Sequence, residues 1–306
     1  MNNIISTKAT IFRNVKDYKF VPKLTSEQKE EITQKLSSVF PKFTLLNLPS
    51  SDGKIVKFLR NNNLISSKTT NVLVSKDETI SINLFEGEHI SIVASSSGYD
   101  KQVFAKVKEQ ETLLANKISL SFSDEYGYLM SDLSKIGAGI KLECVICLPA
   151  IKELNKIDQV KQNIRKLGYL LKETNNPCEY SLSTICNLGY SEKEIYEEFD
   201  NMVIKLQDLE VESAKMLDVT NHDVITDRTL RSLAILNSAY LMTYDELKKL
   251  IVNLRMGVNL GLIKVDIAQL NKLNALTSAE SEFISETETK ELAEKVKNIL
   301  KGEQNV

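Results

Sequence analysis

The chain has 306 residues, of which 42% are hydrophobic and 26% charged, and its formal net charge is −2. The length predicts roughly two domains with a sizeable core, the composition is that of an ordinary soluble protein, and the balanced charge gives no electrostatic basis for binding nucleic acid or an anionic membrane surface. No apolar run approaches the ~20 residues that span a bilayer, and the first ten residues lack a signal-peptide core, so a cytoplasmic location is expected.

The first part of the chain predicts alternating strands and helices. Residues 4–13 read as a strand, and Thr25 with Gln28 forms a capping box that opens a helix ended by Pro41. Apolar residues alternate with polar ones in 71–74 and 79–84 on either side of a Lys-Asp-Glu turn, which is typical of a hairpin. Asp100 is expected to cap a helix whose apolar stripe is Phe104, Val107 and Leu114.

A glycine-rich bend precedes the next predicted strand. From Ile140 to Leu148 every even position is apolar, which is the period of a half-buried strand and points Lys141 away from the core. Gly137 and Gly139 allow the backbone to turn sharply and to approach a phosphate-bearing ligand closely. On these residues alone, a simple bend into a strand is the favoured interpretation.

Cys144 and Cys147 form a CxxC pair, which raises the question of zinc or redox chemistry. Their separation is odd on a strand, so their side chains leave opposite faces and cannot close on one metal. The chain has only two histidines. We therefore expect core cysteines and no metal site.

The second part of the chain predicts mostly helices. Pro149 begins a helix with a stripe that runs to Leu167, residues 180–188 form a strand, and Ser191 with Glu194 opens a long helix. The polar segment 219–225 interrupts the helical periodicity, and all that follows reads as helical, with residues 286–304 expected as an exposed, charged last helix or a frayed tail. The predicted domains are residues 1–220 and 221–306.

The order of these parts resembles the ATP:guanido phosphotransferases, specifically the bacterial protein-arginine kinases. The resemblance is carried by Gly127-Tyr128-Leu129, the Gly-x-Gly bend, the strand end Leu148-Pro149-Ala150 and the helical-domain run that starts Arg255-Met256-Gly257. It implies an α+β fold, with an antiparallel sheet flanked by helices as the catalytic domain. A small all-helical domain, which mediates dimerisation in the family, is expected to follow.

The same resemblance places five phosphate-holding arginines of the family on positions that lack arginine here. Those positions are Lys8, Thr10, Ser91, Lys141 and Lys172. Lysine keeps the charge but loses the bidentate fork that grips phosphate oxygens.

Other parts of the family's machinery are also replaced. The carboxylate that takes the guanidinium proton falls on Gly87, and the reactive cysteine falls on Asp132. The mobile glycine-rich loop falls on residues 172–177, which contain a proline and no glycine. The phosphoarginine-reading motif falls on residues 288–293, where only Ala293 agrees with it.

Read without the family, Glu86 and Glu88 are two carboxylates on one face of a strand end beside His89. Such a cluster serves as an acid/base pair or a cation site, although charged residues more often form a solvated strand end, and His89 is expected to be structural. The one route by which the lost base could be replaced is that the carboxylate of Glu86, Glu88 or Asp132 takes its place from a shifted position.

The resulting hypothesis is a catalytically inactive relative of the protein-arginine kinases that needs no cofactor and binds ATP and magnesium at most weakly. The resemblance implies protein partners: a zinc-containing activator protein, the Clp protease machinery, a stress-response repressor or an intact kinase, together with a homodimer. The alternative is a residual ATP-dependent phosphotransferase that acts on protein arginines.

Overall fold

The computed structural model describes residues 2–185, 188–277 and 286–302. An eight-stranded antiparallel sheet with flanking helices and a helical carboxyl-terminal region confirms the predicted α+β class. Its strand order is β2-β3-β4-β5-β1-β8-β10-β9, and a separate pair is formed by β6 and β7. The strands are β1 (Ile4–Arg13), β2 (Thr44–Asn47), β3 (Asn71–Val74), β4 (Ile80–Glu86), β5 (Glu88–Ser97), β6 (Phe122–Ser123), β7 (Gly127–Tyr128), β8 (Ile140–Cys147), β9 (Tyr169–Glu173) and β10 (Glu179–Thr184).

The chain forms two compact units. One contains residues 6–144 and 183–201, and the other contains residues 1–5, 145–182 and 202–306. Within the described ranges, no helix combines the length and the apolar character that crossing a bilayer requires. The unit that contains residues 6–144 holds most of the predicted site positions.

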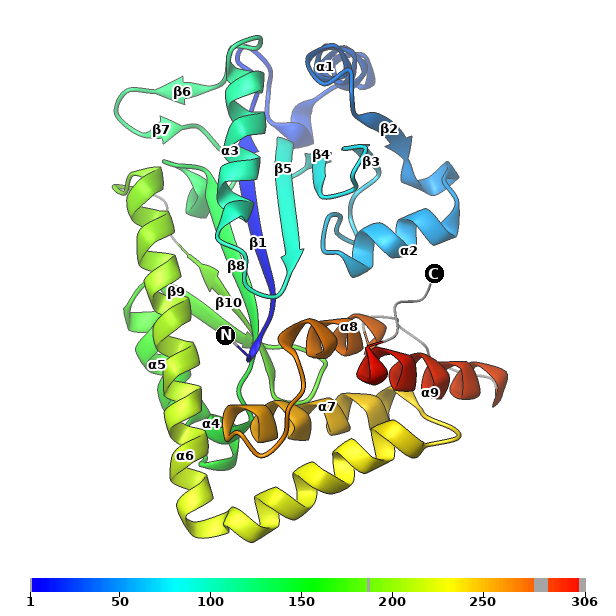
Figure 1. Cartoon of the computed structure of the whole chain (residues 1–306). Coiled ribbons are helices and arrows are strands. Elements are labelled where there is room, and N and C mark those ends of the chain that lie inside the picture. The colour runs from blue at the N-terminus through cyan, green and yellow to red at the C-terminus, as the bar shows by residue number, and fades with distance from the viewer. Residues whose placement is uncertain (1, 186–187, 278–285, 303–306) are drawn as a thin grey trace. The chain divides into compact units, whose positions relative to one another are not determined.

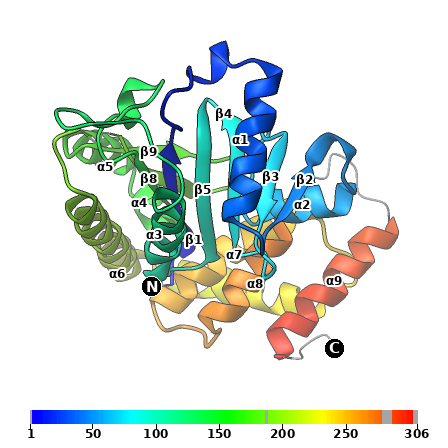
Figure 2. The same cartoon turned by 90° about the horizontal axis from the view of Figure 1, so that it is seen from above.

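One face of the sheet in this unit is covered by α3 (Gln102–Ala115), which lies against β5 (Figures 1 and 2). Helix α1 (Ser26–Val39) contacts α3 and begins with the predicted capping box between Thr25 and Gln28. The predicted cap of α3 is also present, since Asp100 accepts a hydrogen bond from the Gln102 amide at 2.8 Å. The face under α3 carries the buried Ile11 and Ile92, which pair across β1 and β5.

The opposite face of the sheet is partly covered by α2 (Gly53–Asn61), a helix that the sequence did not predict. Its residue Leu59 joins a cluster with Val74 of β3 and Val93 of β5. Because side chains two apart on a strand share a face, this is also the face of Ser91.

The other unit contains the remaining helices. They are α4 (Pro149–Glu153), α5 (Ile157–Lys166), most of α6 (Glu192–Ser238), α7 (Tyr244–Asn259), α8 (Ile267–Thr277) and α9 (Glu286–Lys301). A core that includes Leu236, Leu254 and Leu273 holds α6, α7 and α8 together, and α7 runs beside α8 (Figure 2). The polar segment near 220 corresponds to a kink in α6, where Asn221 has non-helical φ and ψ.

Three sequence predictions need correction. The single helix expected after Pro149 is two helices, because Asn155 between them has φ 57°. Strand β10 ends at Thr184, earlier than expected. Helix α9 is not simply an exposed helix, since Leu292 and Val296 are buried in the helical core.

Candidate functional site

Four of the five expected phosphate positions lie on one face of the sheet. Lys8 and Thr10 alternate along β1, and the pairing of Thr10 with Val93 puts them on the face of Ser91 in β5. Lys141 projects from β8, the other neighbour of β1 in the sheet. The fifth position, Lys172, is exposed on β9 and belongs to the other compact unit.

The two lysines on this face share a carboxylate. Lys141 Nζ lies 2.6 Å from Glu143 Oε1, and Lys8 Nζ lies 3.4 Å from Glu143 Oε2. Burial would raise the pKa of the Glu143 carboxyl, but the ammonium groups of Lys8 and Lys141 outweigh it and hold that pKa below its usual value. Glu143 is therefore ionised and offsets half of the positive charge at these positions. Sequence reasoning missed this role.

The two hydroxyl residues of the same face are not displayed to solvent. Thr10 is 4% exposed and Ser91 is 2% exposed. The Ser91 hydroxyl has no hydrogen-bond partner in the described part of the chain. A short neutral hydroxyl inside the sheet cannot reproduce the reach or the charge of an arginine fork.

The predicted carboxylate pair lies on a hairpin and not on one continuous strand. Strand β4 ends at Glu86, β5 begins at Glu88, and these two residues pair across the turn. Gly87 occupies the turn with φ 84°. The residue expected at the position of the family's base is thus a tight-turn glycine in a conformation that favours glycine.

Glu88 is fully buried, so the prediction of a solvated strand end is wrong for this residue. Its carboxylate accepts hydrogen bonds from Asn14 Nδ2 at 2.7 Å and from the Ser131 amide at 3.0 Å. It also accepts from the Ser131 hydroxyl at 2.9 Å and from the Asp132 amide at 3.2 Å. Its oxygens hold the 131–132 segment in place, which leaves them little capacity to receive a substrate proton.

Glu86 is also engaged. It accepts hydrogen bonds from the Ser66 hydroxyl at 2.9 Å and from the Thr69 hydroxyl. These contacts turn the Glu86 carboxylate toward the 66–69 segment, whereas Glu88 faces the 131–132 segment. The two carboxylates therefore serve different loops.

Asp132, which the resemblance places at the position of the family's cysteine, is a capping residue. It accepts hydrogen bonds from the amide and hydroxyl of Ser134, at 3.0 and 2.8 Å, and its Oδ2 lies 3.6 Å from Lys135 Nζ. The Ser134 hydroxyl, and then the Lys135 ammonium, hold the pKa of the Asp132 carboxyl below its usual value. A carboxylate kept ionised in this way is a poor acceptor for a proton near neutral pH.

His89 is structural, as predicted. Its Nδ1 accepts from the Val15 amide at 3.1 Å, and Nε2 lies 2.8 Å from the Lys19 carbonyl oxygen. Burial lowers the pKa of His89, so the ring stays neutral near pH 7. Neighbouring Asn14 completes this arrangement, because its Oδ1 accepts from the His89 amide at 2.8 Å.

The segment at the place of the family's mobile loop is a closed turn between β9 and β10. The Glu179 carboxylate accepts from the Thr174 hydroxyl and from Asn176 Nδ2, both at 3.1 Å. The Thr174 amide donates to the Glu179 carbonyl oxygen at 3.0 Å. These contacts tie both ends of the turn together and oppose closure over a ligand.

The CxxC cysteines are core residues, as predicted: Cys144 and Cys147 are 1% and 2% exposed. Burial raises the pKa of both thiols. Within residues 2–185, 188–277 and 286–302, no group of three His, Cys, Asp or Glu side chains is arranged to hold a metal ion.

Restoring a carboxylate at position 87 is expected to destabilise the protein. Gly87→Glu places a side chain at φ 84°, and we expect a loss of about 1 to 2 kcal/mol in the free energy of unfolding, measured by urea denaturation. Gly53→Glu is the control, because Gly53 begins α2 in open space without a positive φ. An equal loss in both variants would contradict the assignment of strain to the hairpin turn.

Comparison with known proteins gives matches over most of the chain. Residues 5–213 match the family model of the ATP:guanido phosphotransferase C-terminal catalytic domain, and residues 222–304 match that of the protein-arginine kinase McsB C-terminal domain. A protein-arginine kinase of Clostridium perfringens is 28% identical over 305 residues, covering 94% of this chain and 90% of the relative. One of Staphylococcus haemolyticus is 25% identical, covering 97% of this chain and 93% of the relative.

Solved structures agree on the fold. The duplicated taurocyamine kinase from Schistosoma mansoni with bound transition state analog components matches with a TM-score of 0.64 and 18% identity. The match covers 80% of this chain but only 38% of that duplicated protein. A lombricine kinase matches with a TM-score of 0.59 and 16% identity, over 68% of this chain and 66% of its own.

Proposed function

The chain belongs to the ATP:guanido phosphotransferase family, in its protein-arginine kinase group, and we propose that it is a catalytically inactive member that acts by binding other proteins. The observation that carries this proposal is the Glu143 carboxylate between Lys8 and Lys141. Lys8 and Lys141, the two lysines at the expected phosphate positions of this sheet face, are both engaged with an internal anion. A nucleoside triphosphate would have to compete with the Glu143 carboxylate for these two lysines.

The magnitudes favour loss of activity. Thr10 and Ser91 replace two charged forks, and each lost hydrogen bond to a charged group is worth about 1.5 to 3 kcal/mol, so nucleotide affinity falls by roughly a hundredfold or more. Phosphoryl transfer depends almost wholly on positioning and charge neutralisation. Removing the base at Gly87 costs a further ~10²- to 10⁴-fold in rate.

A shifted carboxylate does not offer a ready replacement for that base. Glu88 is buried among four donors, Glu86 binds two hydroxyls of another segment, and Asp132 caps its own turn. Recruiting any of them would break hydrogen bonds that hold the loops around the site. Positional errors near 1 Å already cost ~10²-fold in rate, so partial rearrangement would not suffice.

The test measures transfer and binding on the full chain. With labelled ATP, magnesium and an arginine-rich protein, we expect no acid-labile phosphate above a blank, and a dissociation constant for MgATP weaker than about 1 mM by calorimetry. Glu143→Gln is expected to tighten MgATP binding about tenfold by releasing both lysines, whereas Glu30→Gln on α1 changes nothing. Phosphoarginine that disappears in Glu86→Gln or Asp132→Asn would refute the proposal in favour of a residual phosphotransferase.

We propose an intact protein-arginine kinase as the partner to test first, and the family resemblance also implies the activator protein, the Clp machinery and a stress repressor. Adding this chain to the Clostridium perfringens kinase should change its rate of protein-arginine phosphorylation and produce a complex in sedimentation. An unchanged rate together with separate sedimentation would exclude this regulatory role.

A further inference from the structure

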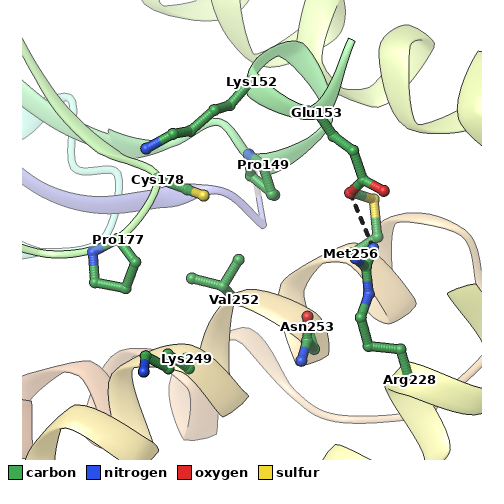
Figure 3. A pocket seen from close by; sticks show the side chains of 10 residues that line it. All are labelled: Pro149, Lys152, Glu153, Pro177, Cys178, Arg228, Lys249, Val252, Asn253 and Met256. Carbon is green, nitrogen blue, oxygen red and sulfur yellow. Dashed lines mark hydrogen bonds and ion pairs between the residues drawn. The ribbon is translucent and has the colours of Figure 1, made fainter. Parts of the chain in front are cut away.

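A cavity lies in the compact unit that contains residues 145–182 and 202–306. The described residues that line it include none of the five expected phosphate positions. It has a volume of about 300 Å³ and is formed by α4, the turn before β10, α6 and α7 (Figure 3). Its apolar wall consists of Pro149, Pro177, Val252 and Met256. This size and lining are typical of sites that take small organic ligands.

Three cations surround the apolar wall. Lys152 comes from α4, Lys249 from α7 and Arg228 from α6 (Figure 3). Among the described residues that line the cavity, Glu153 is the one acidic side chain. The lining therefore carries an excess of positive charge, which complements an anion.

The existing ion pairs leave these cations available. Lys152 pairs with Glu173 at 3.1 Å and Arg228 pairs with Glu153 at 3.0 Å, but all four side chains are between about a third and a half exposed. Pairs of this kind contribute little, so an incoming anion can share or displace them. Among the described residues, Lys249 forms no ion pair.

Arg228 also presents an unused donor. Its Nε is buried and has no hydrogen-bond acceptor in the part of the chain that the structure describes, while one of its terminal nitrogens donates to Glu153. A buried donor without an acceptor is unfavourable, and an oxygen of a bound ligand would satisfy it. This observation is independent of the cavity and of its charge.

We propose that this cavity binds an anionic group, a carboxylate or a phosphoryl group, carried on a small apolar body. The anion lies among Lys152, Arg228 and Lys249, and the apolar body lies against Pro149, Val252 and Met256. The ligand is either a free small acid or an acidic side chain beside an apolar one in a partner protein. The inference holds whether or not the chain transfers phosphate, because the cavity shares no residue with the phosphate positions.

Calorimetry on the full chain with benzoate, phenyl phosphate, inorganic phosphate and benzylamine tests whether the ligand needs a negative charge and an apolar body. We expect benzoate and phenyl phosphate to bind with dissociation constants near or below about 1 mM, inorganic phosphate about tenfold more weakly, and benzylamine not at all. Lys249→Gln should weaken both acids about tenfold, while Lys272→Gln, an exposed lysine of α8, should leave them unchanged. Benzylamine binding equal to that of benzoate, or no loss in Lys249→Gln, would overturn the proposal.

A second measurement needs no substitution. Cys178 lines the cavity, and burial raises the pKa of its thiol. Bound phenyl phosphate should slow the alkylation of Cys178 by iodoacetamide, followed by mass spectrometry of the peptide that contains it, and unchanged alkylation at saturating ligand would refute occupancy of this cavity. A Phe-Glu peptide with blocked termini distinguishes a segment of a partner protein from a free small acid as the ligand. Peptide binding tighter than that of benzoate assigns the site to a protein segment. Weaker peptide binding assigns it to a free acid.

Discussion

Replacing Arg13 with methionine is expected to lower the free energy of unfolding by about 3 to 5 kcal/mol, because it removes one partner of a buried ion-pair network. The Arg13 side chain is fully buried, and its Nε donates to Glu111 at 2.9 Å while one terminal nitrogen donates to Glu192 at 3.1 Å. The other terminal nitrogen donates to the carbonyl oxygens of Phe12 and Ala138, at 2.7 and 3.0 Å. The guanidinium also stacks 3.4 Å from the centre of the Tyr128 ring.

The loss is large because Glu111 stays behind. Its side chain is 3% exposed, and burial would raise the pKa of its carboxyl, but Arg13 and Lys108 outweigh burial and hold that pKa below its usual value. Without Arg13 the carboxylate keeps Lys108 at 2.8 Å and the Tyr128 hydroxyl at 3.0 Å. Two contacts do not compensate a buried charge that previously had a guanidinium beside it.

Urea denaturation measures this effect, and Arg231→Met supplies the matched control. Arg231 is 75% exposed and lies 3.6 Å from Asp227, so its loss should cost less than about 0.5 kcal/mol. Arg13→Lys should fall between the two, since it retains a charge but not the fork. Similar losses for Arg13→Met and Arg231→Met would show that the buried network does not hold this unit together.

The end of β1 and the expected phosphate positions have different roles in this structure. Arg13 and Asn14, at the end of β1, are both buried among structural hydrogen bonds. The departures at Lys8, Thr10 and Ser91 fall on the face that would receive phosphates. This distribution supports the proposal that the chain is catalytically inactive.

Local patterns in the sequence were sufficient for most elements. The capping boxes at Thr25 and Ser191, the start of α4 at Pro149 and the alternation in β8 all depend on residues close in sequence, and all are present. Helix α2 was missed although Asp52 caps it, because the helix has only nine residues within a polar segment. A search for cap residues ahead of short apolar runs could have found it.

The site depended on contacts between distant segments, which no local pattern reports. The role of Glu143 requires β1 and β8 to be neighbours in the sheet, which the spacing within β8 does not reveal. Glu88 looked exposed because the hairpin turn at Gly87 was not recognised. Its burial follows from the 131–132 segment folding over it, more than forty residues away in sequence.

The free energy of unfolding should depend on pH through Glu210, a fully buried residue of α6. Burial raises the pKa of its carboxyl to about 8, even though the amides of Ala150 and Ile151 donate to it at 2.7 and 3.0 Å and favour the ionised form. In the unfolded chain the same group has an ordinary pKa near 4.5. The folded state therefore binds the proton more tightly than the unfolded state.

This difference in pKa determines whether the free energy of unfolding rises or falls with pH. Between about pH 4.5 and pH 8 unfolding releases the proton, so the free energy of unfolding falls as pH rises, by up to about 1.4 kcal/mol per pH unit and roughly 3 to 5 kcal/mol in total. The titratable neighbours are the thiols of Cys147 and Cys178, and both have a pKa raised by burial, so they remain neutral over this range. Among these neighbouring groups, Glu210 is thus the one expected to change its protonation between about pH 4.5 and pH 8.

Glu210→Gln isolates the effect, because it keeps the shape of the side chain but cannot ionise. Urea denaturation of both chains from pH 5 to pH 9 should give a difference in the free energy of unfolding that grows steadily with pH up to about 8 and is then constant. A constant offset caused by the altered hydrogen bonds does not change how this difference depends on pH. Parallel curves of the free energy of unfolding against pH for the two chains would contradict the raised pKa of Glu210.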